Sequence, residues 1–183
     1  MGQVDAKKRR NLPATLGSTM VSLPTIDEQF YSHLTAEDEL GVVVRAHIHI
    51  EASIIDFVRA RVPFPDDLPR LQYEARLRLA IALGLKPQYF ESLKLFGDIR
   101  NTFGHNLDAT LAETRINELF SKLPKEAQEI TLKAYVMIVE QRGGKDTLRF
   151  AQLSPRDRFI LMSVTLKNYI VAAAHEAASK NGP

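Results

Sequence analysis

The feature that most constrains this chain is a proline-free stretch from residue 35 to residue 62, "TAEDELGVVVRAHIHIEASIIDFVRARV". Thr35 stands three residues before Asp38, which is the spacing of a helix-capping box. Apolar residues would line several sides of a helix formed by this stretch. We therefore predict a long helix that starts at Thr35 and lies buried in the middle of a helical domain.

Glycine and proline divide the middle of the chain into further helices. Gly84 is placed to end a helix that contains Tyr73, and Pro87 can occupy the first position of the next helix. That next helix should end near Gly104, with His105 in its last turn.

The last third of the chain gives the same pattern. Pro124 separates two amphipathic segments, and Ser154 followed by Pro155 is a typical start for the final helix. Residues 143–153, "GGKDTLRFAQL", are expected to form a loop with a short strand. The fold prediction is all-α, a single-domain multi-helix bundle of about five to seven helices.

Composition limits the classes of protein to which the chain can belong. Its 45% hydrophobic residues suffice for a core, and with no Cys it can form neither disulfides nor thiolate metal sites. Its most apolar run is interrupted by charged residues, and no signal-peptide pattern follows the basic cluster near the N-terminus. We expect a cytoplasmic protein that contacts no membrane.

The charge is concentrated at the N-terminus. Residues 1–10 hold four basic residues and one Asp, a sum of +3, so the remaining residues sum to 2 − 3 = −1. We therefore predict a flexible basic N-terminal tail over residues 1–24 and an all-helical domain over residues 25–183. A nearly neutral domain is not typical of a broad nucleic-acid surface.

The residues with the clearest chemical potential are Arg100, Asn101 and His105 in "GDIRNTFGHN". On a helix they lie within an arc of about 140°. A guanidinium holds phosphate oxygens, an imidazole transfers protons near neutral pH, and an amide donates and accepts hydrogen bonds. The alternative is structural: His105 favours a helix C-terminus, Asn101 caps a neighbouring element, and Arg100 pairs with an acid such as Glu74.

Two other segments, "RAHIHIE" and "QRGGKDT", contain residues that could form a binding site. If "RAHIHIE" were a strand, Arg45, His47, His49 and Glu51 would share a face, and a metal site would be plausible. On a helix the two histidines lie about 200° apart and cannot share an ion, so we predict two partly buried polar histidines and no metal. The "QRGGKDT" segment lacks the Walker spacing and is interpreted as a flexible turn.

Residues 75–105 resemble the central segment of the mannitol operon repressor family. The similarity lies in "RLRLAIALGL", "KPQYFESL" and "DIRNTFGH", and it extends with weaker identity over about residues 35–120. The resemblance implies an all-helical cytoplasmic bacterial protein that acts as a transcriptional regulator without a recognisable helix-turn-helix.

The "RNTFGH" motif also resembles the Arg-polar-x-x-x-His motif of the HEPN superfamily, many members of which are metal-independent ribonucleases of toxin–antitoxin and phage-defence systems. This resemblance implies Arg100, Asn101 and His105 as the catalytic site. It also implies a homodimer in which two copies of the motif face each other.

Two functions follow as expectations. The first is a mannitol-repressor-like regulatory protein that acts through protein partners and has no DNA-reading motif of its own. The alternative is a HEPN-type metal-independent ribonuclease that acts on RNA. Neither requires a cofactor, and the sequence leaves open whether the chain is an enzyme.

Overall fold

The fold consists of α-helices and short 3-10 helices throughout the part of the chain that the structure, a computed structural model, describes: residues 27–141 and 149–180. No strand occurs in these residues, so the all-α prediction is confirmed. Of the segment 143–153, which was expected to hold a short strand, residues 149–153 are described and contain a 3-10 helix. The α-helices are α1 (Glu28–Thr35), α2 (Glu39–Arg59), α3 (Tyr73–Ala82), α4 (Phe90–His105), α5 (Glu113–Lys122), α6 (Lys125–Gln141) and α7 (Pro155–Lys180). The 3-10 helices are Pro65–Asp67, Pro87–Tyr89 and Phe150–Gln152.

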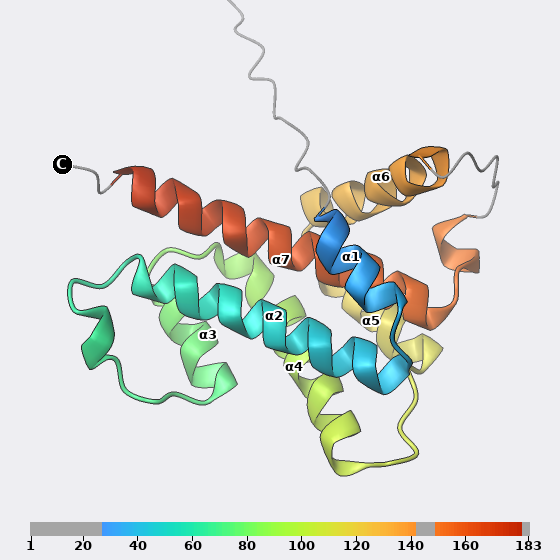
Figure 1. The fold of residues 1–183 in the computed structure, drawn as a ribbon, viewed down its shortest axis with the longest axis horizontal. Coiled ribbons are helices and arrows are strands. Elements are labelled where there is room, and N and C mark those ends of the chain that lie inside the picture. Colours follow the sequence, from blue (N-terminus) through green and yellow to red (C-terminus); the bar gives the residue numbers. More distant parts are fainter. Residues whose placement is uncertain (1–26, 142–148, 181–183) are drawn as a thin grey trace, which may run out of the picture.

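The two long helices α2 and α7 pack side by side and form the centre of the molecule (Figure 1). Helices α3 and α4 pack against α2 and against each other, α1 and α6 pack against α7, and α5 contacts both α4 and α7. Phe96 of α4 stacks on Phe159 of α7 with ring centroids 4.9 Å apart. Helix α2 is covered by α3, α4 and α7 on one side, but Leu40 and Ile48 on its outer side are exposed, so the prediction of a long buried helix is correct for one side of α2 only.

The start of α2 differs from the prediction. Thr35 is the last residue of α1, and the N-cap of α2 is Asp38, whose Oδ1 accepts a hydrogen bond from the Gly41 backbone N–H at 2.7 Å. Helix α2 therefore begins four residues later than the predicted start at Thr35, and Thr35 belongs to a separate helix, α1.

Helix α1 is held against α7 at both of its ends. The Arg156 guanidinium donates hydrogen bonds to the carbonyl oxygens of Thr35 (2.9 Å) and Glu37, which lie at and just beyond the α1 C-terminus. At the other end Asp27, the N-cap of α1, forms an ion pair with Lys167. A cation at a helix C-terminus and an acid at the N-terminus both suit the helix dipole.

Gly84 produces the turn between α3 and α4. It has φ +103°, which only glycine adopts readily, and its N–H donates to the Ile81 carbonyl while the Leu85 N–H donates to the Ala80 carbonyl. The predicted glycine stop is confirmed. Pro87 starts a 3-10 turn and not α4 itself, which begins at Phe90.

Prolines also mark the boundary between α5 and α6 and the start of α7. Pro124 lies between α5 and α6 as predicted, and α7 begins at Pro155. The Ser154 hydroxyl accepts a hydrogen bond from the Asp157 N–H at 3.1 Å, as an N-cap should.

Two predictions concern residues that the structure does not describe. The basic tail over residues 1–24 and most of the "QRGGKDT" turn lie outside the described residues. Among the residues that are described, no helix is both long enough and apolar enough to cross a membrane.

Candidate functional site

The structure places Arg100, Asn101 and His105 on the exposed side of α4. Phe96, Ile99 and Phe103 on the opposite side of the same helix are buried in the core. The buried residues recur every three to four positions, which places them on one side of the helix. Because that side packs in the core, the residues on the other side face the solvent.

A polar stripe runs along this exposed side. It consists of Lys94, Asp98, Asn101 and His105, whose spacing of four, three and four residues keeps them on one face. Arg100 lies at the edge of the stripe, and its Nη1 donates a hydrogen bond to Asn101 Oδ1 at 3.1 Å. The polar stripe and Arg100 together place two cations, a carboxylate, an amide and an imidazole on one helix.

Lys94, Asp98 and Asn101 of the polar stripe form one wall of a pocket of about 420 Å³ between α2, α3 and α4. These three helices pack against one another (Figure 1). We call this pocket the α4 pocket. Arg100 and Asn101 line it, whereas His105 does not and lies about 6 Å further along the helix axis. The full lining comprises His47, Glu51, Gln72, Tyr73, Glu74, Lys94, Gly97, Asp98, Arg100 and Asn101.

Tyr73 and Gly97 fix the shape of the α4 pocket. A Cβ atom added at Gly97 would lie 2.6 Å from the Tyr73 ring, so the glycine is what lets the start of α3 approach α4. The Tyr73 hydroxyl donates a hydrogen bond to the Leu93 carbonyl at 2.9 Å. Burial raises the pKa of this phenol, and the nearby Glu51 and Asp98 carboxylates raise it further, so Tyr73 stays protonated and positions the two helices.

A buried imidazole lies on the α2 side of the pocket. The His47 ring centroid is 4.6 Å from that of Tyr73, and its Nδ1 lies 3.7 Å from Glu51 Oε2. Glu51 also forms an ion pair with Arg76. Burial lowers the pKa of His47, Glu51 opposes this effect, and the positive charge of Arg100 adds to it. His47 is therefore a neutral imidazole at neutral pH.

The charges around the α4 pocket are unevenly paired. Glu74 forms an ion pair with Arg78, with N···O distances of 3.1 and 2.6 Å, so the Arg100–Glu74 pair considered as a structural alternative does not form. Within residues 27–141 and 149–180, neither Arg100 nor Lys94 has an ion-pair partner. Two cations at the pocket are thus available to hold an anion, with Asn101 beside them to share in the hydrogen bonding.

The alternative metal site does not form. The "RAHIHIE" segment is helical, and His49 points away from His47 to pack on Phe30, with ring centroids 4.8 Å apart. The described part of the chain holds no group of three side chains suited to a metal ion.

Of the ten residues that line the α4 pocket, the predicted site included only Arg100 and Asn101. Lys94 was visible as the residue that continues the helical spacing of Asp98 and Asn101 toward the N-terminus of α4. Gly97 in the middle of a helix was a signal of close packing. The place of His47 beside Tyr73 depends on how α2 and α3 pack, and no local pattern indicates it.

Comparison with protein-family models, with curated proteins and with solved structures found nothing that matches this chain.

Proposed function

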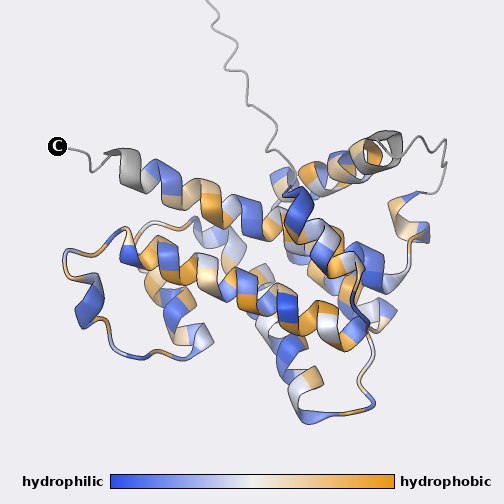
Figure 2. Ribbon diagram, in the orientation of Figure 1, coloured by the Kyte–Doolittle hydropathy of each residue, from blue (hydrophilic) through white to orange (hydrophobic). Residues whose placement is uncertain are grey.

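We propose that this chain is a regulatory protein that acts by binding a protein partner, as its resemblance to the mannitol operon repressor family implies. The observation that supports the proposal is an apolar stripe on the outer side of α2. It consists of Leu40, Val44, Ile48 and Ala52, spaced four residues apart. We call it the α2 stripe, and Figure 2 shows apolar positions recurring along this helix.

The α2 stripe is unusually open for a central helix. The exposed fraction is 49% for Leu40 and 59% for Ile48, although the opposite side of α2 is buried. Contiguous apolar side chains at the surface are typical of protein-binding sites. The nearly neutral charge of residues 11–183 does not favour direct reading of DNA bases.

The α2 stripe can be tested with a charged substitution at its centre. Ile48→Glu should leave the fold intact, because Ile48 is exposed, and should prevent recovery of a specific partner in a pull-down from cells. Val136→Glu on α6 is the matched control, since Val136 is 52% exposed and distant in the fold from α2. Equal recovery with Ile48→Glu and with the wild type would contradict the proposal, and the mass of the purified protein distinguishes a second copy from a different partner.

A second function, metal-independent cleavage of RNA, is favoured by the uncommitted cations at the α4 pocket. Arg100 has no acidic partner among the described residues, and its hydrogen bond to Asn101 fixes its direction. In this reaction the 2′-hydroxyl attacks the adjacent phosphorus and the 5′-oxygen leaves. His105 would take up the proton of the 2′-hydroxyl and deliver a proton to the leaving 5′-oxygen. Arg100 would stabilise the negative charge that develops on the phosphate oxygens.

The ribonuclease function predicts a metal-independent activity with one essential imidazole. Purified protein should degrade single-stranded RNA in the presence of EDTA, and His105→Ala should abolish the degradation. His33→Ala is the control, because His33 is also exposed but lies on α1. Degradation that survives His105→Ala would come from another site or a contaminant, and would rule out this function.

A further inference from the structure

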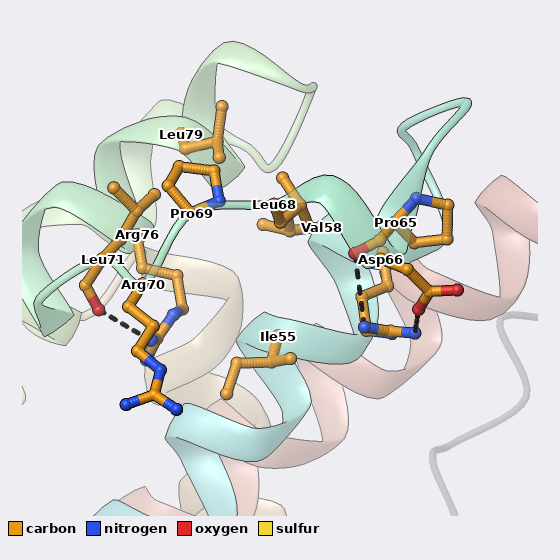
Figure 3. A pocket seen from close by; sticks show the side chains of 11 residues that line it. Ile55, Val58, Pro65, Asp66, Leu68, Pro69, Arg70, Leu71, Arg76 and Leu79 are labelled. Carbon is orange, nitrogen blue, oxygen red and sulfur yellow. Dashed lines mark hydrogen bonds and ion pairs between the residues drawn. The ribbon is translucent and has the colours of Figure 1, made fainter.

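A second pocket lies where α2 ends, on the side of the molecule that carries the following loop and α3. Its volume is about 240 Å³. Its lining comes from three segments, α2, the loop at residues 60–72 and α3, as Figure 3 shows, and it combines seven apolar residues with three arginines and Asp66. The apolar lining residues are Ile55, Val58, Pro65, Leu68, Pro69, Leu71 and Leu79.

Two of the three arginines at this pocket are already paired. Arg59 donates to Asp66 Oδ1 at 2.8 Å and to the Pro65 carbonyl at 3.3 Å. Arg76 binds Glu51 and donates to the Leu71 carbonyl at 2.7 Å. Figure 3 shows these contacts to Pro65, Asp66 and Leu71 as dashed lines.

Arg70 differs from its neighbours. It is exposed, and it has no hydrogen bond or ion pair within the described ranges. In Figure 3 its side chain extends toward α2 on the side where Ile55 lies. The pocket therefore combines apolar walls with one guanidinium that is free to bind an anion.

We propose that this pocket binds a small amphipathic carboxylate, such as a monocarboxylic acid with a short alkyl or aryl group. The apolar group lies against Ile55, Leu68 and Leu79, and the carboxylate forms paired hydrogen bonds with the Arg70 guanidinium. Pockets for drug-sized ligands usually hold roughly 300–1,000 Å³, so the smaller volume here selects a smaller molecule.

The lining also excludes other small ligands. A sugar or polyol has neither the alkyl group that would pack on the apolar lining residues nor the negative charge that would pair with Arg70. An inorganic anion would satisfy Arg70 but leave the apolar walls unfilled. The proposal does not depend on either function proposed above, because the purified chain alone should bind the carboxylate.

The proposal can be tested by titrating the full chain with hexanoate and following amide chemical shifts by NMR. The chemical shifts of amides in the loop at residues 60–72 and at the end of α2 should change with hexanoate concentration and reach a plateau. Hexanol, mannitol and inorganic phosphate should each bind at least about tenfold more weakly, because each lacks either the charge or the apolar group.

Substitutions inside and outside the pocket test whether hexanoate binds there. Arg70→Gln should weaken hexanoate binding about tenfold or more, whereas Arg78→Gln, an exposed arginine of α3 outside the pocket, should not change it. Ile55→Glu places a negative charge in the pocket and should abolish binding independently. Undetectable binding, equal affinity for hexanol, or unchanged affinity in Arg70→Gln would overturn the proposal.

Discussion

Gly97 has the strictest spatial requirement of the residues around the α4 pocket. It is buried in the middle of α4, where glycine is normally unfavourable, and the Tyr73 ring occupies the space that a side chain would need. The close contact of α3 with α4, and with it the width of the α4 pocket, therefore depends on one absent methyl group.

Gly97→Ala should lower the free energy of unfolding by about 1–3 kcal/mol, because the new methyl group must displace the Tyr73 ring or the helix. Gly104→Ala in the same helix is the matched control. No atom lies within 4 Å of the Cβ position there, so this substitution should raise the free energy of unfolding by up to about 1 kcal/mol. Chemical denaturation of both variants measures the difference, and similar effects of the two would contradict the packing described.

Helices α5 and α7 are joined by a buried guanidinium. The Arg158 side chain is 3% exposed, and it donates to Asn117 Oδ1 at 2.8 Å and to Glu113 Oε1 at 2.5 Å. A buried cation is tolerated only where it is paired and hydrogen-bonded. These contacts therefore determine where α5 lies along α7.

Glu113→Ala should lower the free energy of unfolding by about 1–3 kcal/mol, because it leaves part of a buried guanidinium without an acceptor. The cost stays below that of a fully buried pair, since the Glu113 side chain is 58% exposed. Glu118→Ala on the same helix removes an exposed pair with Arg115 and should cost at most about 1 kcal/mol. If thermal or chemical unfolding finds the two variants equal, Arg158 does not depend on Glu113.

The helices show which features of the fold could be predicted from sequence. The stops at Gly84 and Pro124 and the start at Ser154 are local signals, and each is found where it was expected. The start of α2 was placed at Thr35 and not at Asp38 because both residues resemble caps. Arg156, more than a hundred residues away, binds the carbonyls at the end of α1, and a contact of that kind has no local signature.

The candidate site could also be predicted only in part, because some of its features depend on local sequence and others on tertiary packing. The exposed position of Arg100, Asn101 and His105 follows from helical periodicity, which a sequence displays directly. The pocket beside them requires His47 and Tyr73 from two other helices, and their meeting depends on tertiary packing.

One buried and one partly buried histidine of α2, His47 and His49, make the stability of the whole molecule depend on pH. Burial lowers the pKa of both His47 and His49 below the ordinary value of 6.5. Between the lowered and the ordinary pKa the unfolded chain binds more protons than the folded chain. Folding is therefore favoured most above pH 6.5, and this contribution is lost as the pH falls through the lowered pKa values.

The free energy of unfolding should consequently decrease as the pH is lowered from about 7 toward 5. His47→Gln should make this decrease smaller, and adding His49→Gln should make it smaller again, whatever the stability of each variant at neutral pH. Urea denaturation at a series of pH values gives the slopes. A slope that is the same in the wild type and the double variant would show that other groups cause the pH dependence.

The attachment of α1 to α7 at two points also has a kinetic consequence. A helix of eight residues is too short to persist alone in water, so α1 owes its order to the burial of Phe30 and Leu34 in the core and to the contacts with Arg156 and Lys167 at its ends. These anchors are eleven residues apart on one continuous helix, and breaking either one leaves the other in place. Detachment of α1 thus requires the near-simultaneous loss of both, which makes it a rare, all-or-none fluctuation and not gradual fraying from one end.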